Sequence, residues 1–378
     1  MQFPNDATYA GKKVFLTGHT GFKGSWLTLW LNRLGAEVTG YALSPPSDPS
    51  HFEIANLGST LAANHQADIR DISSLTEAMS AAEPDIVFHL AAQSVVRTSY
   101  QIPRETFEVN VIGSIGVLDA VRTLSKPPAV VMVTSDKCYE NVEQVWGYRE
   151  DDALGEHDPY GGSKGAAEIA IRSYRHSFFP TARISEHGVR IASARAGNVI
   201  GGGDWTKDAL IVDAMLALRQ GIPIRIRSPR ALRPWQHVLQ CLSGYLTLGA
   251  RLLGPNPEKY CSGWNIGPLP GNEIPVKELV THLISRWGGG EFLDVSDPKQ
   301  PPEANILRLN IDKAIWDLGW KPCWPVDKTL DKTVHWYKEY FSCVESMYEF
   351  GMTQIGEYEA EMRGVPTCLF PTPMMVSE

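Results

Sequence analysis

Short apolar runs and segments with helical spacing alternate along the first half of the chain. The apolar runs, which predict β-strands, span residues 14–16, 37–43, 65–68, 84–90 and 129–134. The segments whose apolar residues recur at helical spacing lie at 22–34, 73–81 and 104–124. Such alternation is typical of a parallel sheet covered by helices on both faces. The pattern therefore predicts an α/β fold of the Rossmann type, with a doubly wound parallel sheet.

Three glycines, Gly18, Gly21 and Gly24, lie between the first predicted strand and the first predicted helix. In this position the first glycine permits a tight turn, the second lets the backbone approach a ligand, and the third lets the helix pack on the strand. The free N–H groups at the start of the helix favour a pyrophosphate. An ordinary strand-to-helix turn can also carry glycines, but a clear strand before them and an amphipathic helix after them favour nucleotide binding.

Candidate ligand residues follow the ends of the predicted strands. They are Gly18, Asp68, residues 91–93 and residues 135–137. Because ligands of doubly wound sheets bind beyond the carboxyl ends of the strands, these positions should converge on one edge.

The acidic side chain that usually holds the adenosine ribose is absent from its expected place, about 20 residues beyond the third glycine. Residues 41–44 read Tyr-Ala-Leu-Ser, so that Ser44 could bond a ribose hydroxyl. Asp68 and Ile69 are better placed to meet the adenine. We therefore expect NAD as the cofactor rather than NADP.

Tyr160 and Lys164 are four residues apart in a predicted helix over 160–179, and so lie on one helix face. A tyrosine has an ordinary pKa of about 10 and is a poor base at neutral pH. A nearby ammonium group and an oxidised nicotinamide would both favour the phenolate and lower that pKa. A solvated helix face can carry such a pair by chance. Placed after a glycine loop and a fifth strand, the pair predicts a catalytic base and its partner.

Length and composition narrow the class of protein. A chain of 378 residues is long enough for two lobes, and a formal charge of −8 argues against a nucleic-acid partner. Residues 1–10 have no apolar core of signal-peptide length, and no stretch reaches the length of a membrane span. Six widely separated cysteines show no metal-ligand spacing. We expect a cytoplasmic protein with reduced thiols, no metal site and no membrane partner.

Several motifs resemble the extended short-chain dehydrogenase/reductase superfamily. They are residues 18–24, residues 89–93, Asn110 and residues 160–164. Three further blocks, 134–141, 195–205 and 233–238, are similar to the CDP-glucose 4,6-dehydratase family within it. The similarity extends over roughly residues 8–345 and leaves the tail without an assignment.

The resemblance implies conversion of CDP-D-glucose to CDP-4-dehydro-6-deoxy-D-glucose with loss of water. Tyr160 would be the base for the sugar 4-hydroxyl, Lys164 would tune it, and Ser135 would bond the same hydroxyl. Asp136 would be the acid on the C6 oxygen, provided that it is protonated. Lys137 would be the base at C5, where related deoxythymidine-diphosphate-glucose dehydratases have a glutamate. Lys137 could instead stabilise the enolate while another group takes the proton, or form a structural ion pair with Asp136.

The resemblance also implies two sets of binding residues. Those expected to hold NAD are Gly18, Thr20, Gly21, Phe22, Gly24, Asp68, Ile69, Ala91, Ala92, Gln93, Tyr160 and Lys164. Those expected to hold the nucleotide sugar are Thr134, Arg195, Asn198, Trp205, Arg233 and His237. Arginine suits a diphosphate because its guanidinium bonds in a bidentate fork. Trp205 could border the pyrimidine or pack in the core, and Ala209 and Val212 replace a usual arginine and proline.

Two lobes and an oligomer complete the expectation. Residues 1–195 should form the NAD-binding domain, and 196–378 should form mainly a smaller α/β substrate lobe. Part of 228–250 could return to the first domain. Helices at 104–124 and 160–179 commonly pair in this superfamily, which predicts a homodimer or homotetramer. Three other functions stay open: a nucleotide-sugar 4-epimerase, a dehydratase for another nucleoside-diphosphate glucose, and a non-catalytic NAD sensor.

Overall fold

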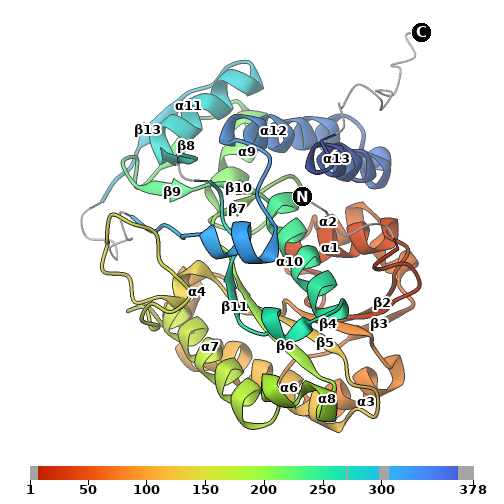
Figure 1. The fold of residues 1–378 in the computed structure, drawn as a ribbon. Coiled ribbons are helices and arrows are strands. Elements are labelled where there is room, and N and C mark those ends of the chain that lie inside the picture. The colour runs from red at the N-terminus through yellow and green to blue at the C-terminus, as the bar shows by residue number, and fades with distance from the viewer. Residues whose placement is uncertain (1–6, 270, 298–305, 365–378) are drawn as a thin grey trace.

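A seven-stranded parallel sheet forms the centre of the computed structural model, which describes residues 7–269, 271–297 and 306–364 (Figure 1). Its strand order is β11-β6-β5-β4-β1-β2-β3. The strands are β1 (Lys13–Thr17), β2 (Glu37–Ala42), β3 (Ala63–Gln66), β4 (Ile86–His89), β5 (Ala129–Val133), β6 (Arg190–Arg195) and β11 (Gly263–Asn265). The doubly wound parallel sheet that the sequence predicts is confirmed.

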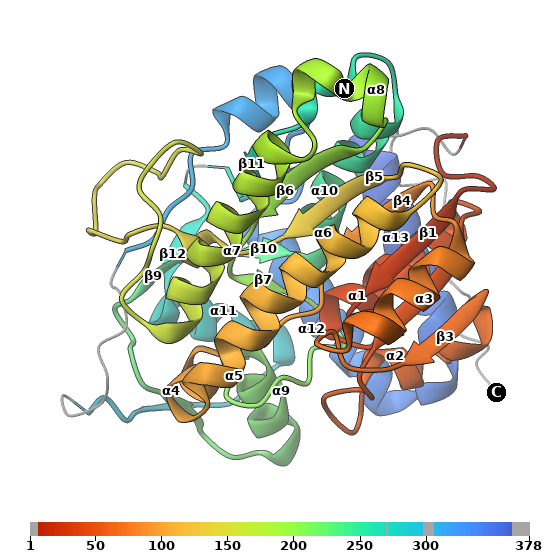
Figure 2. The same cartoon turned by 90° about the horizontal axis from the view of Figure 1, so that it is seen from below.

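Helices cover both faces of this sheet. They include α1 (Phe22–Arg33), α3 (Ile72–Ala82), α6 (Gly113–Thr123), α7 (Pro159–Ser177) and α10 (Val238–Leu253). Successive residues of β1 point to opposite faces, because Val14 and Leu16 join the core beneath α1 and α10 whereas Phe15 joins the core beneath α3, α6 and α7. Figure 2 shows the second layer, α3, α6 and α7, in front of the sheet.

The predicted helix over 104–124 is three consecutive segments. Helix α5 (Pro103–Phe107) leads into a π-helical turn, η2 (Glu108–Ile112), and then into α6. Asn110 in this turn donates from Nδ2 to the Gln93 carbonyl at 3.0 Å and to Ser163 Oγ at 2.8 Å. The turn thus joins the loop after β4 to α7. A π-helical turn contains one residue more than an α-helical turn, and the apolar spacing of the sequence did not indicate it.

Smaller elements of the second half lie together above the sheet in Figure 1. The helices there are α9 (Leu210–Gln220), α11 (Val276–Trp287) and α12 (Val326–Ser342). Three two-stranded sheets pair β7 (Val199–Ile200) with β10 (Gln236–His237), β9 (Leu232–Pro234) with β12 (Glu273–Pro275), and β8 (Ile224–Ile226) with β13 (Phe292–Asp294). The short helices α2 (His51–Ile54), α4 (Val96–Gln101) and α8 (Ile184–His187) lie in the first half. Helix α10 and strand β11 belong to the central layers, and the domain boundary at 195 stays a prediction.

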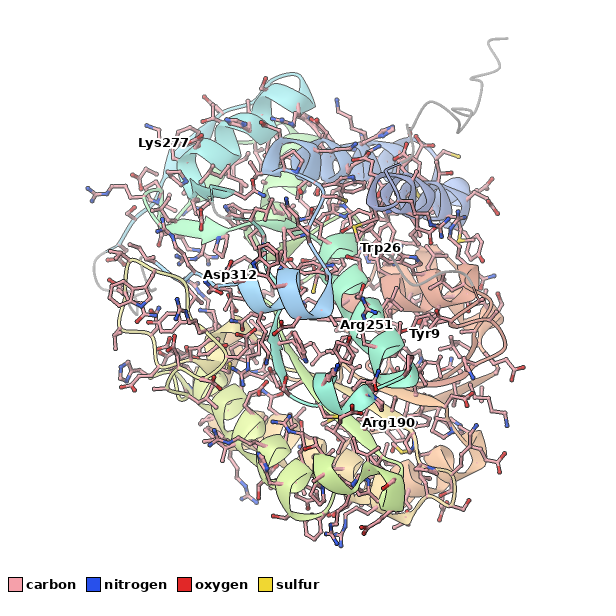
Figure 3. All side chains as sticks on the ribbon, in the orientation of Figure 1. Tyr9, Trp26, Arg190, Arg251, Lys277 and Asp312 are labelled. Atoms are coloured by element: carbon pink, nitrogen blue, oxygen red, sulfur yellow. The ribbon has the colours of Figure 1, made fainter. Side chains whose placement is uncertain are left out.

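The part of the tail that the structure describes is a helix, α13 (Met347–Met362), packed on α1 and α12. Glu359 accepts hydrogen bonds from Trp30 Nε1 at 2.8 Å and Arg33 Nε at 3.1 Å. Trp26 in α1, labelled in Figure 3, donates to the Gly202 carbonyl at 2.8 Å. These contacts tie α1 to the second half of the chain. Within the described ranges, no helix has the length and apolar character needed to cross a membrane.

Candidate active site

The glycine loop after β1 has no room for a side chain at Gly18 or at Gly24. A Cβ atom on Gly24 would lie 2.0 Å from the Gly18 carbonyl oxygen, and one on Gly18 would lie 2.7 Å from the Ala91 nitrogen. Gly18 also has a φ of 75°, which favours glycine. Helix α1 begins just beyond Gly21, and no side chain caps that end. The loop therefore offers backbone N–H groups to an anion at the start of α1.

A cavity of about 420 Å³ opens beyond the carboxyl ends of β1, β2, β3, β4 and β5. Most residues predicted to hold the cofactor line it: Gly18, Thr20, Gly21, Phe22, Gly24, Asp68, Ile69, Ala91, Ala92, Tyr160 and Lys164. Thr134, predicted to contact the sugar, lines it too. The structure thus brings these residues to one edge of the sheet. Their binding roles stay predictions.

The end of the cavity beside Asp68 holds a group of charged side chains that sequence analysis did not predict to lie together. Arg70 forms an ion pair with Asp68 at 2.6 Å and lies 3.4 Å from Glu105 and 3.6 Å from Glu108. The guanidinium of Arg70 holds the pKa of Asp68 below its ordinary value. Arg104 also pairs with Glu108, at 2.7 Å, so that three carboxylates face two arginines and this end stays net negative, which disfavours a 2′-phosphate.

Tyr160 and Lys164 lie at the cavity wall, 8 % and 5 % exposed. Asp158 caps α7 by accepting from the Gly161 nitrogen at 2.9 Å, which fixes where the helix begins. Burial raises the pKa of Tyr160 more than its hydrogen bond to Ser135 lowers it. Burial and the nearby charge of Lys23 lower the pKa of Lys164 to about 8. In the protein alone the pKa of Tyr160 is therefore raised rather than lowered as predicted, because burial is the largest influence on it.

Ser135 and Asp136 lie beside Tyr160, where β5 passes into a short 3₁₀ turn, η3 (Asp136–Cys138). Ser135 Oγ donates to Asp136 Oδ1 at 3.1 Å and accepts from the Lys137 nitrogen at 3.2 Å. Asp136 is 2 % exposed, and the Asn198 amide lies 3.5 Å from its second oxygen. Lys137 is half-buried. The turn therefore places a buried carboxyl group and a lysine next to the predicted base.

Three predicted residues have other partners. The guanidinium of Arg195 is buried against Glu168 at 2.8 Å, and His237 is fully buried with Nδ1 accepting from the Leu239 nitrogen at the start of α10. This placement argues against a phosphate-binding role for either. Gln93 does not line the cavity, because its side chain bonds Thr106 and the Val95 nitrogen.

The two remaining predicted residues lie in the second half. Trp205 packs against the aromatic rings of Trp336, Tyr337 and Tyr340, which favours the core-packing alternative. Arg233 in β9 is half-buried and donates to the Leu232 carbonyl at 2.9 Å.

Sequence reasoning missed several residues of the cavity wall: Lys23, Arg70, Ser94, Glu105 and Thr206. Lys23 lies within the glycine motif, and its position there was the available signal. Glu105 comes from α5, far along the chain from Asp68, so that only the fold brings the two together.

Comparisons with known proteins agree with this geometry. A family model described as GDP-mannose 4,6 dehydratase matches residues 15–195. A CDP-glucose 4,6-dehydratase from Salmonella typhimurium is 45% identical over 350 residues, which cover 93% of this chain and 97% of that protein. The chain belongs to the CDP-glucose 4,6-dehydratase family.

Other relatives of the family share the fold at lower identity. A CDP-paratose 2-epimerase from Salmonella typhi is 30% identical over 345 residues, 86% of this chain and 98% of that protein. The structure of a dTDP-glucose 4,6-dehydratase from Streptomyces venezuelae, solved with NAD bound, superimposes with a TM-score of 0.73 at 23% identity, covering 87% of this chain and 98% of that one.

Replacing Lys164 should stabilise the protein while it inactivates the site. Because the pKa of Lys164 is about 8 in the folded protein and about 10.4 in an unfolded chain, protonation favours unfolding. This penalty is fully present below pH 8 and disappears as pH rises through the unfolded value. Lys164→Met should raise the free energy of unfolding by roughly 3 kcal/mol at neutral pH, and by much less at about pH 9.5. Denaturant titrations measure the difference. Exposed Lys207→Met is the control, and equal gains at both pH values would contradict the account.

Adding one methyl group behind Asp136 should disable the site. A Cβ on Gly197 would lie 1.9 Å from the Asp136 carboxyl carbon, so Gly197→Ala must displace that group. Because displacement of a reacting group by about 1 Å can cost 100-fold in rate, we expect a loss of turnover of about that size. The control is Gly58→Ala, whose Cβ would make ordinary contacts with Phe52 at 3.6 Å and Asn64 at 3.9 Å. Turnover of Gly197→Ala within twofold of the unmodified protein would exclude a role for the Asp136 position.

Proposed function

We propose that this chain catalyses the NAD-dependent dehydration of CDP-D-glucose to CDP-4-dehydro-6-deoxy-D-glucose, a hydro-lyase reaction. One observation carries the proposal: a near full-length match to the dehydratase family coincides with a cavity lined by Tyr160 and Lys164, and Tyr160 bonds Ser135 at the start of the turn that carries Asp136 and Lys137. The first two residues suit oxidation at C4, and the other three suit elimination across C5 and C6.

The cavity fits NAD. Gly18, Gly21 and Gly24 line the cavity at the uncapped start of α1, and the net negative end beside Asp68 suits a ribose without a 2′-phosphate. Gly18, Gly21 and Gly24 would hold the pyrophosphate, Asp68 and Ile69 the adenosine, and Lys164 the nicotinamide ribose. When bound, NAD accepts the C4 hydrogen as hydride and returns it to C6.

Tyr160 takes the proton of the sugar 4-hydroxyl. Ser135, which bonds Tyr160, holds the same hydroxyl in place. The charges of Lys164 and of an oxidised nicotinamide favour the phenolate and oppose the burial that raises the pKa of Tyr160. The pair thus performs the acid–base part of C4 oxidation.

Elimination follows because a ketone at C4 acidifies the C5 proton. The C5–H and C6–O bonds break, a C5=C6 double bond forms, and water leaves. Asp136, which is buried beside Tyr160, gives its proton to the departing C6 oxygen. Lys137 takes the C5 proton or, if another group does so, stabilises the enolate. The same base returns a proton to C5 when hydride is delivered to C6, which completes the product and allows exchange with solvent.

Substrate contacts beyond the reacting atoms come from both halves of the chain. Thr134 lines the cavity, and Asn198 lies next to Asp136, so both are placed to contact the sugar. Arg233 supplies a cation for the diphosphate. The product would enter synthesis of deoxysugars for a surface polysaccharide such as lipopolysaccharide O-antigen. Cys138, Cys241, Cys261 and Cys323 are thiols outside any disulfide, which supports a reducing, cytoplasmic compartment.

The helices over 103–123 and 159–177 support a homodimer, or a homotetramer built from it. They leave Phe107, Ile112 and Ile169 between 40 % and 51 % exposed. Phe107 also lies within 3.6 Å of where a Cβ on Gly162 would be, so the apolar residues of the two helices adjoin. Apolar side chains grouped in this way are typical of a surface that a second subunit covers.

A nucleotide-sugar 4-epimerase is the second candidate, since a UDP-glucuronate 4-epimerase is among the relatives. An epimerase needs Tyr160 and Lys164 but no acid and base for C5 and C6. The Asp136–Lys137 turn beside Tyr160 therefore favours the dehydratase.

Product analysis tests the proposed reaction. The purified protein is incubated in deuterated water with CDP-, UDP-, GDP- or deoxythymidine-diphosphate-glucose, and products are analysed by mass spectrometry and NMR. We expect loss of water from CDP-glucose alone, with one solvent deuterium at C5. An unchanged mass with inverted configuration at C4 would identify an epimerase. Loss of water from another of the four sugars would mean that the substrate carries a different nucleotide. Absence of turnover with every sugar would overturn the catalytic proposal.

Charging the exposed helix face should separate the subunits. Ile169→Glu buries a charge in the proposed interface, so the molar mass by light scattering should fall to that of a monomer. Ile222→Glu is the control, because Ile222 is similarly exposed on a different part of the molecule. A monomeric unmodified protein would contradict the proposal directly.

A further inference from the structure

A buried glutamate extends the catalytic face of α7. Glu168 lies four residues beyond Lys164 and eight beyond Tyr160, and is 3 % exposed. Its Oε1 accepts from Thr134 Oγ1 at 2.5 Å, and its Oε2 accepts from Ser193 Oγ and from Arg195 Nη2, each at 2.8 Å. One carboxylate oxygen is therefore bonded to the residue that follows β5, and the other is bonded to strand β6.

Arg195 carries the connection onward. Its Nη1 donates to Tyr139 Oη and to the Glu150 carbonyl, each at 2.8 Å. Tyr139 in turn donates to Asn265 Oδ1 at 2.6 Å, and its ring stacks on Tyr148 with centroids 5.3 Å apart. The hydroxyl of Tyr139 is thus a relay between Arg195 and β11.

The two ends of the catalytic turn meet this network. Thr134 immediately precedes Ser135, Asp136 and Lys137, and Tyr139 follows them after Cys138. Resting on the function proposed above, we propose that Glu168 and Arg195 are positioning residues. They hold both ends of the 135–138 turn against α7. Asp136 and Lys137 thereby face the sugar whose 4-hydroxyl Tyr160 deprotonates.

The network remains charged in the folded protein. Burial alone would raise the pKa of Glu168, but the charge and hydrogen bonds of Arg195, with those of Thr134 and Ser193, hold it below its ordinary value. Glu168 in return raises the pKa of Arg195 against the effect of burial. A buried pair whose polar atoms are satisfied by hydrogen bonds restricts geometry more than a mobile surface pair does. Arg195 is consequently engaged within the protein rather than with a phosphate.

This arrangement separates the two chemical steps. Tyr160 and Lys164 are fixed by α7 itself, whereas Asp136 and Lys137 depend on the ends of their turn. Loosening the Tyr139 end should therefore slow elimination more than C4 oxidation. Enzyme in which the sugar is oxidised but not yet dehydrated would then accumulate, with its nicotinamide reduced.

Tyr139→Phe tests the inference while keeping the stacked ring. The holoenzyme is mixed with CDP-glucose, and the near-ultraviolet absorbance of reduced nicotinamide is followed together with product formation. We expect kcat to fall by about tenfold with KM nearly unchanged, and reduced nicotinamide to build up during turnover. Tyr148→Phe is the matched control, since its hydroxyl bonds Asn141 and the Val142 nitrogen but neither Arg195 nor Glu168.

Thermal denaturation distinguishes positioning from a general loss of structure. A lower melting temperature and fewer active molecules, without reduced nicotinamide during turnover, would mean a structural role only and overturn the inference. Unmodified kinetics in Tyr139→Phe would overturn it as well. If the unmodified protein fails to dehydrate CDP-glucose, the proposed function fails instead.

Discussion

Removal of water from one face of α7 is the constraint on which the site depends. Tyr160, Lys164 and Glu168 lie on that face at four-residue intervals and are all nearly inaccessible to solvent. Each polar group there loses hydration and needs a compensating partner. Glu168 has three donors from the protein, whereas Lys164 faces the cavity and has a lowered pKa. The part of this face around Glu168, whose polar groups are hydrogen-bonded within the protein, therefore supports the part around Lys164, which faces the cavity.

The carboxyl edge of the sheet could be predicted because its signals are local. A glycine loop between a strand and a helix, and a tyrosine four residues before a lysine, each lie within one short stretch of chain. Apolar periodicity also located β1, β2, β4 and β5 to within a few residues. Such patterns depend only on the local backbone and on one face of a helix, and both are found in the structure as predicted.

Partners that come from distant parts of the chain could not be predicted. Arg195 has the chemistry of a phosphate ligand, but its partner Glu168 reaches it from a helix 27 residues earlier in the chain. His237 was expected to bind the substrate, but its ring is fully buried and packs edge-to-face against Trp324. The π-helical turn at Asn110 and the charges around Arg70 depend likewise on packing between elements. Residue type identifies what a side chain can bind, and tertiary structure decides what it does bind.

The first half of the chain is also held by the second. Trp26 and Trp30 on the outer face of α1 bond the Gly202 carbonyl and Glu359, so that α1 is fixed from two sides. Since the glycine loop leads directly into α1, these contacts restrain the pyrophosphate cradle from outside the sheet. Helix α13 therefore has a physical role in this family member, because it buries an aromatic surface of α1 that would otherwise face water. The cofactor loop, the catalytic turn and the C-terminal helix are in this sense parts of one packed unit.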